Sequence, residues 1–473
     1  MDKKLQVLME LHPCFYGHAG IPQETRLLFS YFLELAHVDS TGFINPDIPS
    51  LSIAPLHHFL AQRKTCHEQV NEHSRFIIST LNPTDFSALE KGKIGVNLFR
   101  ASLKSMLGLS LPMGHFQAKG FEDFLWEKLF AKTLASGDYS NITQALYRSL
   151  HLSRHTLYMI QWGRFFPKIA TKEYDVFLVQ TPFPGRVSRN TQLVVRYHDA
   201  VPLFVPHLIH DPKSHQALHY RALCANAKKG IFVCTSHAVR DDLLQVFPTL
   251  ENRTPVIHDT ISPSYFEEKA HPLLLTEMIQ NFSSSAVNSH HDLACTYIMM
   301  VSTLEPRKNQ LRLIRAWERV RMSLPFDLKL LFIGSEGWQV EPILAAMRPW
   351  QERGLLFHLQ NVPVDNLRLL YQGAACVVCP SVKEGFDLSG IEAMACGGKV
   401  VASDISVHRE IYGEAAEYFD PYSVQHQAEA IQAVVSGDHG SRLREKGLKQ
   451  VKSYQKSAIQ PQWEAFFETI RRP

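Results

Sequence analysis

Two glutamates in the carboxyl-terminal half, Glu384 and Glu392, lie where an apolar run ends and a short helix is predicted to begin, in CPSVKEGFDLSGIEAMACGG (residues 379–398). The free N–H groups at a helix start attract anions such as phosphate. A carboxylate one turn inside the helix suits a neutral diol such as a ribose, because it accepts two O–H bonds. The pattern therefore indicates a nucleotide diphosphate that carries a sugar. The alternative is a pair of ordinary surface glutamates at a helix start.

Glycine and serine residues around these acids fit the same chemistry. Gly385 and Gly390 permit a close approach of a ligand to the backbone. Ser389 is a suitable cap for a helix over residues 391–396, which two following glycines would end. The stretch is not a Walker A loop, since Gly390 is followed by Ile391 rather than by lysine.

Two adjacent cations follow an earlier apolar run of the same half, in STLEPRKNQ (residues 302–310). Arg307 and Lys308 would come at the carboxyl end of a strand, before Asn309 as a helix cap. Arginine offers a bidentate fork and lysine a point charge, and both suit a diphosphate. If they share one crevice with the two glutamates, they balance the charge of the diphosphate without a metal ion. A solvated basic loop is the alternative.

The elements that would position these residues alternate regularly from residue 295 onward. Apolar runs without polar alternation predict buried strands, and amphipathic segments between them predict helices. This alternation indicates a doubly wound α/β domain, in which ligands bind outside the carboxyl ends of parallel strands. The predicted strands of this half are residues 295–302, 328–335, 354–362, 375–381, 399–404 and 415–421.

The first half shows the same alternation less regularly. Residues 85–170 do not fit it and are interpreted as an insert of extra helices, and the polar, serine-rich stretch 273–292 marks a domain boundary. We therefore expect two doubly wound, Rossmann-like domains that face a central cleft. The predicted strands of this half are residues 5–11, 75–79, 174–180, 191–199, 230–236 and 254–260.

Composition narrows the function classes. A net charge of +3, from 49 basic and 46 acidic residues, argues against a dedicated nucleic-acid binder. No apolar stretch approaches the roughly 18 residues of a membrane-spanning helix, and residues 1–17 are interpreted as a buried strand rather than a signal peptide. Eight cysteines in so long a chain predict no disulfide framework and fit a cytoplasmic protein. Cys376 and Cys379 would point to opposite faces of a strand, so we expect no metal site there.

Taken together, these motifs resemble glycosyltransferase family 4, the retaining nucleotide-sugar transferases of GT-B fold. The resemblance rests on the EPRKN loop (305–309), the two glutamates eight residues apart, the EAMACG helix (392–397) and SVHREIYGEAAEYFDPYS (406–423). It is close over about 296–425, moderate over 174–260, thin over 5–31 and absent over about 40–170.

The family fold implies an acceptor-side amino-terminal domain, a nucleotide-sugar-binding carboxyl-terminal domain and a last helix that crosses back to the first domain. The expected boundaries are 1–270 for the first domain, with its insert at about 85–170, 271–292 for a linker, 293–455 for the second domain and 456–473 for the last helix.

The resemblance also implies a role for each matching residue. Arg307 and Lys308 would hold the donor diphosphate, and Glu392 would bind the ribose. Glu384 would contact the donor sugar near its reacting carbon, and His198, in RYHDAVP, would reach across the cleft to the same sugar. A capped core histidine is the alternative for His198. The implied catalytic residues are His198, Arg307, Lys308 and Glu384. The loop residues that would also line the donor are Gly385, Phe386, Asp387, Leu388 and, toward the base, residues 361–364.

The chain departs from the family pattern at several positions. Asp387 stands where the family often has glycine, and Ser389 where it often has proline, so Asp387 would bear on which sugar is accepted. The family's glycine-rich loop, which touches the donor phosphate and the acceptor, would fall at residues 17–26. The resemblance implies Gly17 and Gly20 as its equivalents, in altered spacing.

The reaction implied is transfer of a hexose from a nucleotide diphosphate sugar to a hydroxyl, with the anomeric configuration retained. Members of the family are described as front-face transferases, in which the leaving phosphate helps to deprotonate the acceptor. Neither a metal ion nor another cofactor is implied. The alternatives are another GT-B enzyme, such as a nucleotide-sugar epimerase or a phosphorylase, and a non-catalytic subunit that binds a sugar nucleotide.

Substrate and location are implied more loosely. HREIYGEAAEYFDPY (408–422) resembles bacterial mannosyltransferases of O-antigen and other surface polysaccharide synthesis, which implies GDP-mannose as donor and a glycan or lipid-linked glycan as acceptor. Residues 97–116 are apolar with scattered cations. We expect a packed accessory helix there, and peripheral contact with the inner face of the plasma membrane is the alternative.

Overall fold

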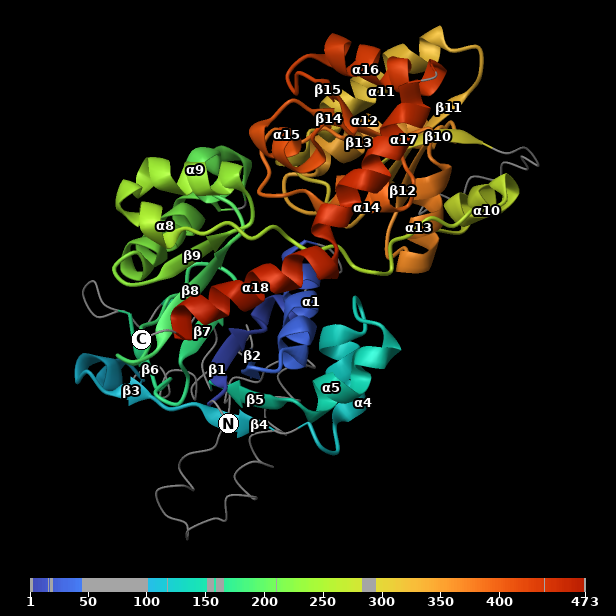
Figure 1. Ribbon diagram of the computed structural model, residues 1–473. Helices are drawn as coiled ribbons and strands as arrows, with labels where there is room; N and C mark the ends of the chain where they lie inside the picture. Colours follow the sequence, from blue (N-terminus) through green and yellow to red (C-terminus); the bar gives the residue numbers. More distant parts are fainter. Residues whose placement is uncertain are drawn as a thin grey trace, which may run out of the picture.

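The computed structural model describes residues 3–15, 17, 20–44, 101–116, 118–150, 157–158, 166–209, 211–282, 295–437 and 439–471. It contains two α/β domains, drawn one above the other in Figure 1, each built around a largely parallel sheet. The predicted pair of doubly wound domains is therefore confirmed. No described helix has both the length and the apolar character needed to cross a bilayer.

The sheet of the first domain has the strand order β4-β5-β2-β1-β7-β8-β9. Neighbouring strands pair in parallel, except β4 with β5. The loops that follow the parallel strands β1, β7 and β8 therefore leave the same edge of the sheet. The strands are β1 (Leu5–Glu10), β2 (Val38–Ile44), β4 (Gly114–Phe116), β5 (Leu146–Ser149), β7 (Val176–Val179), β8 (Gln192–Tyr197) and β9 (Ile231–Cys234), with β3 (Ser110–Leu111) and β6 (Lys168–Ile169) as a separate parallel pair.

Helices cover this sheet, and the last helix of the chain is one of them. In Figure 1, α18 (Lys456–Arg471) runs beside α1 (Ile21–Glu34). Trp463 and Phe467 of α18 meet Phe32 of α1 edge-on, with ring centroids 5.2 and 5.0 Å apart. All three rings belong to the buried core of the first domain. Other described helices of this domain include α4 (Glu122–Leu125), α5 (Tyr139–Gln144), α7 (Val201–Phe204), α8 (Pro212–Asn226) and α9 (His237–Val246).

Part of the predicted helical insert is strand instead. Leu146–Ser149, which the sequence predicts as helix, forms β5 and pairs in parallel with β2. Tyr147 packs there against the rings of Phe29 and Phe116. Such long-range pairing outweighs a local helix propensity.

Two other predicted strands of the first half have different outcomes. Residues 75–79 lie outside the described residues, as do residues 85–100 of the insert. Residues 254–260 are irregular except for an isolated bridge between Cys234 and Val256, so the predicted strand there is wrong. In Figure 1 this segment leads from the end of β9 toward the second domain.

The sheet of the second domain is entirely parallel, with the order β12-β11-β10-β13-β14-β15. Each strand lies inside a range predicted from the sequence. Cys376 and Cys379 belong to different apolar clusters, which confirms that they point to opposite faces of their strand. The strands are β10 (Thr296–Val301), β11 (Leu328–Ile333), β12 (Leu356–Leu359), β13 (Cys376–Cys379), β14 (Val400–Ser403) and β15 (Ala416–Phe419).

The strand order of this sheet reverses between β10 and β13. Ligands of doubly wound sheets bind at such a switch point, because the loops after the two strands diverge to opposite faces and leave a crevice. The predicted linker contains a helix, α10 (Pro272–Phe282), whose Leu275 and Ile279 enter the core of the second domain. The remaining helices are α11 (Gln310–Ser323), α12 (Glu341–Gln351), α13 (Val364–Gly373), α14 (Leu388–Ala395), α15 (Ser406–Tyr412), α16 (Val424–Ser436) and α17 (His439–Gln450).

Candidate active site

The loop after β10 brings the two predicted cations against Glu384 of the loop after β13. Arg307 Nη1 lies 2.7 Å from Glu384 Oε2, and Lys308 Nζ lies 2.6 Å from Glu384 Oε1. Arg307 also donates to Glu305 Oε1 at 2.6 Å. The sequence placed the cations at the diphosphate and Glu384 at the sugar, and it did not predict that they touch one another.

Glu384 is buried, with 8% of its side chain exposed, and it is charged. Burial by itself raises the pKa of Glu384, but Arg307 and Lys308 outweigh it and hold the pKa below its ordinary value. Burial likewise opposes the charge on both cations, yet the Glu384 carboxylate raises the pKa of Arg307 and of Lys308. The three side chains therefore form one buried, fully ionised cluster at the switch point.

Asn309 ties the two loops together. It precedes α11 in the left-handed conformation, with φ of 65°, and its side chain does not cap the helix as predicted. Instead its amide donates to the carbonyls of Pro380 at 3.0 Å and Pro421 at 2.8 Å. The positions of the cations are thus fixed relative to the loop after β13.

The start of α14 differs from the prediction in detail. The helix begins at Leu388 rather than at residue 391, and Asp387 precedes it with a left-handed φ of 66°. Ser389 does not cap the helix, because its hydroxyl donates to Asp387 Oδ1 at 2.6 Å. Asp387 Oδ2 lies 3.1 Å from His408 Nε2. Burial opposes ionisation of Asp387, but the contact with His408 and the charge of Lys308 lower its pKa, so that Asp387 is ionised.

Gly385 presses this loop against the first domain. Its carbonyl accepts a hydrogen bond from Ser236 Oγ at 2.8 Å. A Cβ atom at this position would lie 1.8 Å from the carbonyl oxygen of His198, so only glycine fits. The neighbouring Phe386 and Leu388 are buried.

Glu392 also faces the first domain. Its carboxylate, in a residue only 2% exposed, accepts hydrogen bonds from Gln23 Nε2 at 3.0 Å and from Tyr371 Oη at 3.1 Å. Burial raises the pKa of Glu392 to about 7, although these two donors oppose the rise. Gln23 lies in the first turn of α1, just after Gly20, which precedes the helix with φ of 68°. Gln23 therefore links Glu392, which is predicted to bind the ribose, to the predicted glycine-rich loop.

His198 follows β8 and is buried between two polar side chains. Its Nδ1 lies 3.5 Å from Glu24 Oε2, and its Nε2 lies 3.3 Å from Gln180 Oε1. Burial lowers the pKa of His198 to about 4, although Glu24 opposes this, so the ring is neutral near pH 7. Glu24 Oε2 and Gln180 Nε2 are buried without a hydrogen-bond partner among the described residues. One acceptor atom of Glu24 and one donor atom of Gln180, on the two sides of the imidazole ring, could therefore still form a hydrogen bond with a ligand.

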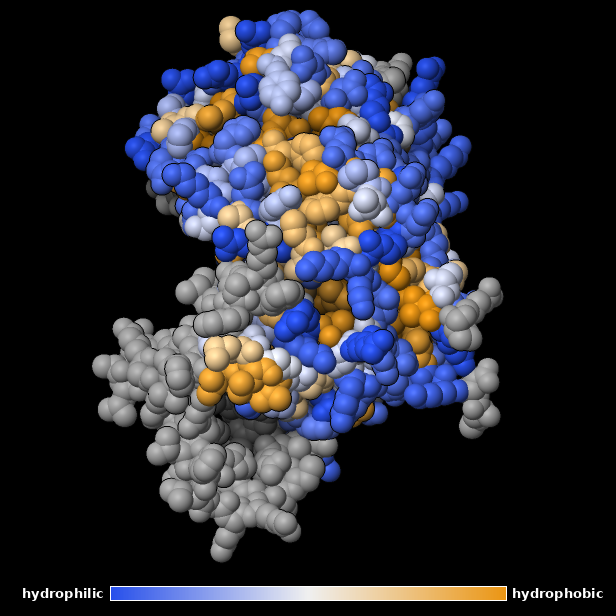
Figure 2. Space-filling view, turned by 90° about the vertical axis from the view of Figure 1, so that its left-hand side faces the viewer, coloured by the Kyte–Doolittle hydropathy of each residue, from blue (hydrophilic) through white to orange (hydrophobic). Residues whose placement is uncertain are grey.

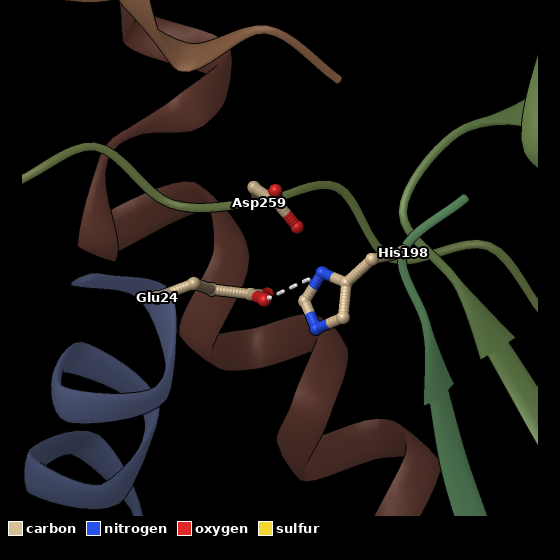
Figure 3. Close-up of side chains that lie close together, drawn as sticks. All are labelled: Glu24, His198 and Asp259. Atoms are coloured by element: carbon tan, nitrogen blue, oxygen red, sulfur yellow. Dashed lines mark ion pairs between the residues drawn. The ribbon is translucent and has the colours of Figure 1, made fainter. Parts of the chain in front are cut away.

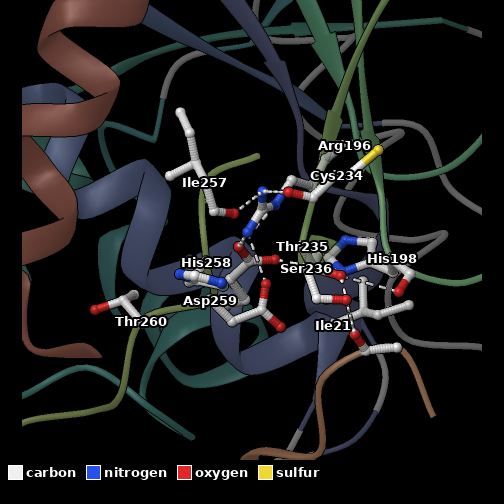
Figure 4. Close-up of polar contacts among 12 residues, drawn as sticks. Ile21, Arg196, His198, Cys234, Thr235, Ser236, Ile257, His258, Asp259 and Thr260 are labelled. Atoms are coloured by element: carbon white, nitrogen blue, oxygen red, sulfur yellow. Dashed lines mark hydrogen bonds and ion pairs between the residues drawn. The ribbon is translucent and has the colours of Figure 1, made fainter. Parts of the chain in front are cut away.

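Glu24, His198 and Asp259 lie close together in Figure 3. Their ligand-type atoms are within 4.8 Å of one another. These residue types bind metal ions, but Arg196 already places a cation here. Arg196 Nη2 lies 2.5 Å from Glu24 Oε1 and 2.7 Å from Asp259 Oδ1. Figure 4 shows Arg196 and Asp259 beside His198. Burial opposes the charge on Glu24, but Arg196 lowers the pKa of Glu24, whereas burial and Glu24 raise the pKa of Asp259. One guanidinium therefore balances one ionised carboxylate.

The predicted site residues of the two domains thus meet at one interface. Arg307, Lys308 and Glu384 form one cluster, and the next residue, Gly385, touches His198. Sequence reasoning missed the residues that hold His198 and Glu392, and the only signal for two of them was the predicted glycine-rich stretch 17–26. The missed residues are Gln23, Glu24, Gln180, Arg196, Ser236 and Asp259. The contact of residues 361–364 with a base stays a prediction.

The second domain is similar in sequence to known glycosyltransferases. Residues 288–451 match the family model described as glycosyl transferases group 1. O-antigen chain mannosyltransferase B of Escherichia coli is 31% identical over 159 residues, which cover 33% of this chain and 42% of that protein. The alignment thus spans less than half of the length of this relative. The resemblance predicted from the EPRKN loop and the two glutamates is confirmed.

Solved structures share this two-domain fold. Sucrose-phosphate synthase from Thermosynechococcus elongatus superposes with a TM-score of 0.60 at 15% identity, over 99% of both chains. HepE from Anabaena, in complex with UDP and glucose, gives a TM-score of 0.56 at 13% identity, over 98% of this chain and 100% of that one. The fold is therefore GT-B.

Proposed function

We propose that this protein is a retaining hexosyltransferase, because residues 288–451 match the family model of glycosyl transferases group 1 and the fold is GT-B. It moves a hexose from a nucleotide diphosphate sugar to a hydroxyl of a glycan. The observation that carries the proposal is the buried cluster of Arg307, Lys308 and Glu384 at the switch point. Such a cluster offers two fixed cations beside a carboxylate, next to the loop that touches His198.

The cations would stabilise the leaving group. When the bond from the sugar to the diphosphate breaks, negative charge grows on the phosphate oxygens. Arg307 and Lys308 are already held in place by Glu384 and Glu305, so they need not reorganise as this charge develops. The free N–H groups at the start of α14 would add to this stabilisation.

The remaining residues would orient the donor. The Glu392 carboxylate would accept O–H bonds from the ribose in place of its bond from Gln23. His198 is neutral near pH 7, so it would exchange hydrogen bonds with a sugar hydroxyl rather than supply a charge. The leaving phosphate would take the proton from the acceptor hydroxyl, which leaves no separate general base to be supplied by the chain.

The proposed donor is GDP-mannose, and the proposed acceptor is a growing glycan or lipid-linked glycan of a bacterial surface polysaccharide. The sequence relative is named an O-antigen chain mannosyltransferase, which supports mannose as the sugar and such a glycan as the acceptor. The HepE complex contains UDP and glucose, which supports a nucleotide sugar as the donor class but differs in both base and sugar.

A panel of nucleotide sugars, including GDP-mannose and UDP-glucose, tests the donor by thermal shift. A true donor at about a hundred times its dissociation constant adds roughly 2.7 kcal/mol to the free energy of unfolding. The stabilising donor is then incubated with and without glycan acceptors, and the anomeric configuration of the product is read by NMR. We expect an acceptor-dependent product of retained configuration.

A variant separates this activity from contaminants. Lys308→Ala should lower kcat by roughly 10²–10³-fold, as the loss of one preorganised charge contact does. Lys456→Ala is the matched control, because Lys456 pairs with Glu34 at the surface, away from the proposed site. No stabilisation by any nucleotide sugar, an inverted product, or an epimerised or phosphorylated sugar instead of a glycoside would overturn the proposal.

A further inference from the structure

The first domain exposes a compact group of apolar side chains on the side that carries β3. Residues 101–106 are helical and pack inward through Ala101 and Ser105. The outward side chains form the apolar ridge, which consists of Leu103, Met106, Leu107 and Leu109, with exposed fractions of 43, 49, 61 and 52%. Figure 2 faces this side and shows an orange patch on the lower domain. Apolar groups exposed together in this way mark a docking surface.

A basic pocket adjoins the apolar ridge. Its volume is about 460 Å³, and the described residues that line it include three cations and no acid. No described acidic residue forms an ion pair with any of these cations. Glu173, which is adjacent to Lys172 in the sequence, pairs with Arg148 instead. The lining residues are Ser110, Lys168, Ala170, Lys172, Ser188, Arg189 and Asn190.

Backbone pairing joins the two features. Ser110 follows the last ridge residue, Leu109, and it pairs with Lys168 where β3 lies beside β6. Leu111, the next residue, is buried in the core and fixes this strand to the domain. The exposed Lys104 lies within the ridge itself. Apolar side chains and cations that have no described acidic partner therefore share one continuous surface.

We propose that this surface binds a bilayer that contains anionic lipids. The ridge would enter the boundary between headgroups and acyl chains, and the basic pocket would take the headgroup phosphates. A free phosphate ion would use the pocket but would leave the ridge in water. A bilayer satisfies both features at once, and this match of charge and apolarity selects it as the partner.

The location of the surface suits a docking role. Ser188, Arg189 and Asn190 precede β8, whereas His198 follows it. A strand of this length spans about 20 Å, so the docking surface lies at the opposite end of the sheet from the proposed donor site. Membrane attachment here would leave the interface of the two domains free. Because the ridge and the pocket contain no residue of the proposed donor site, the inference does not depend on the proposed function.

Co-sedimentation of the full chain with lipid vesicles tests the proposal. We expect binding to vesicles of phosphatidylglycerol mixed with phosphatidylcholine, weaker binding at high salt, and little binding to phosphatidylcholine alone. Leu107→Asp with Leu109→Asp should lower the affinity roughly tenfold or more, and so should Lys172→Glu with Arg189→Glu. Met322→Asp with Arg348→Glu is the matched control, because both residues are exposed on the second domain. That control should bind as the wild type does.

Circular dichroism and thermal melting establish that each variant is folded. The proposal is overturned if the wild type sediments with neither vesicle, or if the ridge and pocket variants bind as tightly as the control. It is also overturned if inorganic phosphate stabilises the wild type through Lys172 and Arg189 while the vesicles are ignored, since the pocket would then serve a soluble anion.

Discussion

Gly385 of the second domain lies against the carbonyl oxygen of His198 in the first, with no room for a side chain between them. A Cβ atom at residue 385 would stand 1.8 Å from that oxygen, and Ser236 Oγ donates to the Gly385 carbonyl at 2.8 Å. The contact joins the loop that carries Glu384 to the strand end that carries His198. It therefore sets the distance between the two residues proposed to contact the donor sugar.

Gly385→Ala should separate the domains at this contact. The methyl group forces the loop away from His198, so we expect kcat/KM to fall at least roughly tenfold, the effect of a 1.4 kcal/mol loss. Each domain should stay folded, and the radius of gyration from small-angle scattering should rise. Gly137→Ala is the control, because a Cβ atom there meets nothing within 4 Å. Unchanged kinetics and an unchanged radius in Gly385→Ala would contradict the role of the contact.

The buried cluster around Glu384 predicts strong coupling between its members. Glu384→Gln leaves Lys308 without its carboxylate partner, so we expect the free energy of unfolding to fall by about 3–5 kcal/mol. Lys308→Met should cost less, because Arg307 still pairs with Glu384. The double variant should be more stable than the sum of the single effects implies, by roughly 1–3 kcal/mol. Urea unfolding of the four proteins measures the cycle.

A surface ion pair serves as the control for this cycle. Lys456 Nζ lies 2.6 Å from Glu34 Oε2, but both side chains are more than one-third exposed. Lys456→Met should therefore cost at most about 1 kcal/mol. Additive effects of Lys308→Met and Glu384→Gln would show that the buried cluster is not a unit.

The raised pKa of Glu392 predicts an unusual pH dependence of stability. Because burial raises the pKa to about 7, the folded protein binds more protons at Glu392 than the unfolded protein does between about pH 4.5 and pH 7. The contribution of this group to stability is therefore present below that window and is lost as the pH rises through it. The loss amounts to about 3 kcal/mol.

Glu392→Gln removes this group and should flatten the dependence. The variant should gain stability relative to the wild type as the pH rises from 5 to 8, and chemical unfolding at several pH values measures the difference. Donor affinity should show the opposite trend in the wild type, because the ionised carboxylate is the better acceptor for ribose hydroxyls. Parallel stability curves for the two proteins would contradict the raised pKa.

The sequence was sufficient for the second domain because its strands are buried on both faces. Val377 and Val400, for example, lie in runs that contain no polar alternation, and such runs are unambiguous once helices separate them. The sequence failed at β5 for the opposite reason. Tyr147 and its neighbours form a strand only because β2 is there to pair with them, and that partner lies about a hundred residues earlier.

For the candidate site, the sequence predicted which loops carry the residues but not which residues contact one another. Arg307 and Glu384 could be placed at strand ends, but their contact depends on β10 and β13 being neighbours, which follows from the strand order rather than from either segment. The bond from Gln23 to Glu392 spans 369 residues and two domains. No local pattern encodes such a contact, so residues of this kind emerge only when the domains are placed together.

From the position of Arg196 we predict that the proposed reaction needs no divalent metal ion at the group of Glu24, His198 and Asp259. Its guanidinium contacts both carboxyl groups and already supplies a positive charge, so EDTA should leave the activity unchanged. Arg196→Met leaves the two buried carboxyl groups without this cation and should lower the free energy of unfolding by about 3–5 kcal/mol. The exposed Arg348→Met is the control and should change little. Activity that is lost in EDTA and restored by Mg²⁺ or Mn²⁺ would contradict the prediction, because the guanidinium would then not be the cation on which the reaction relies.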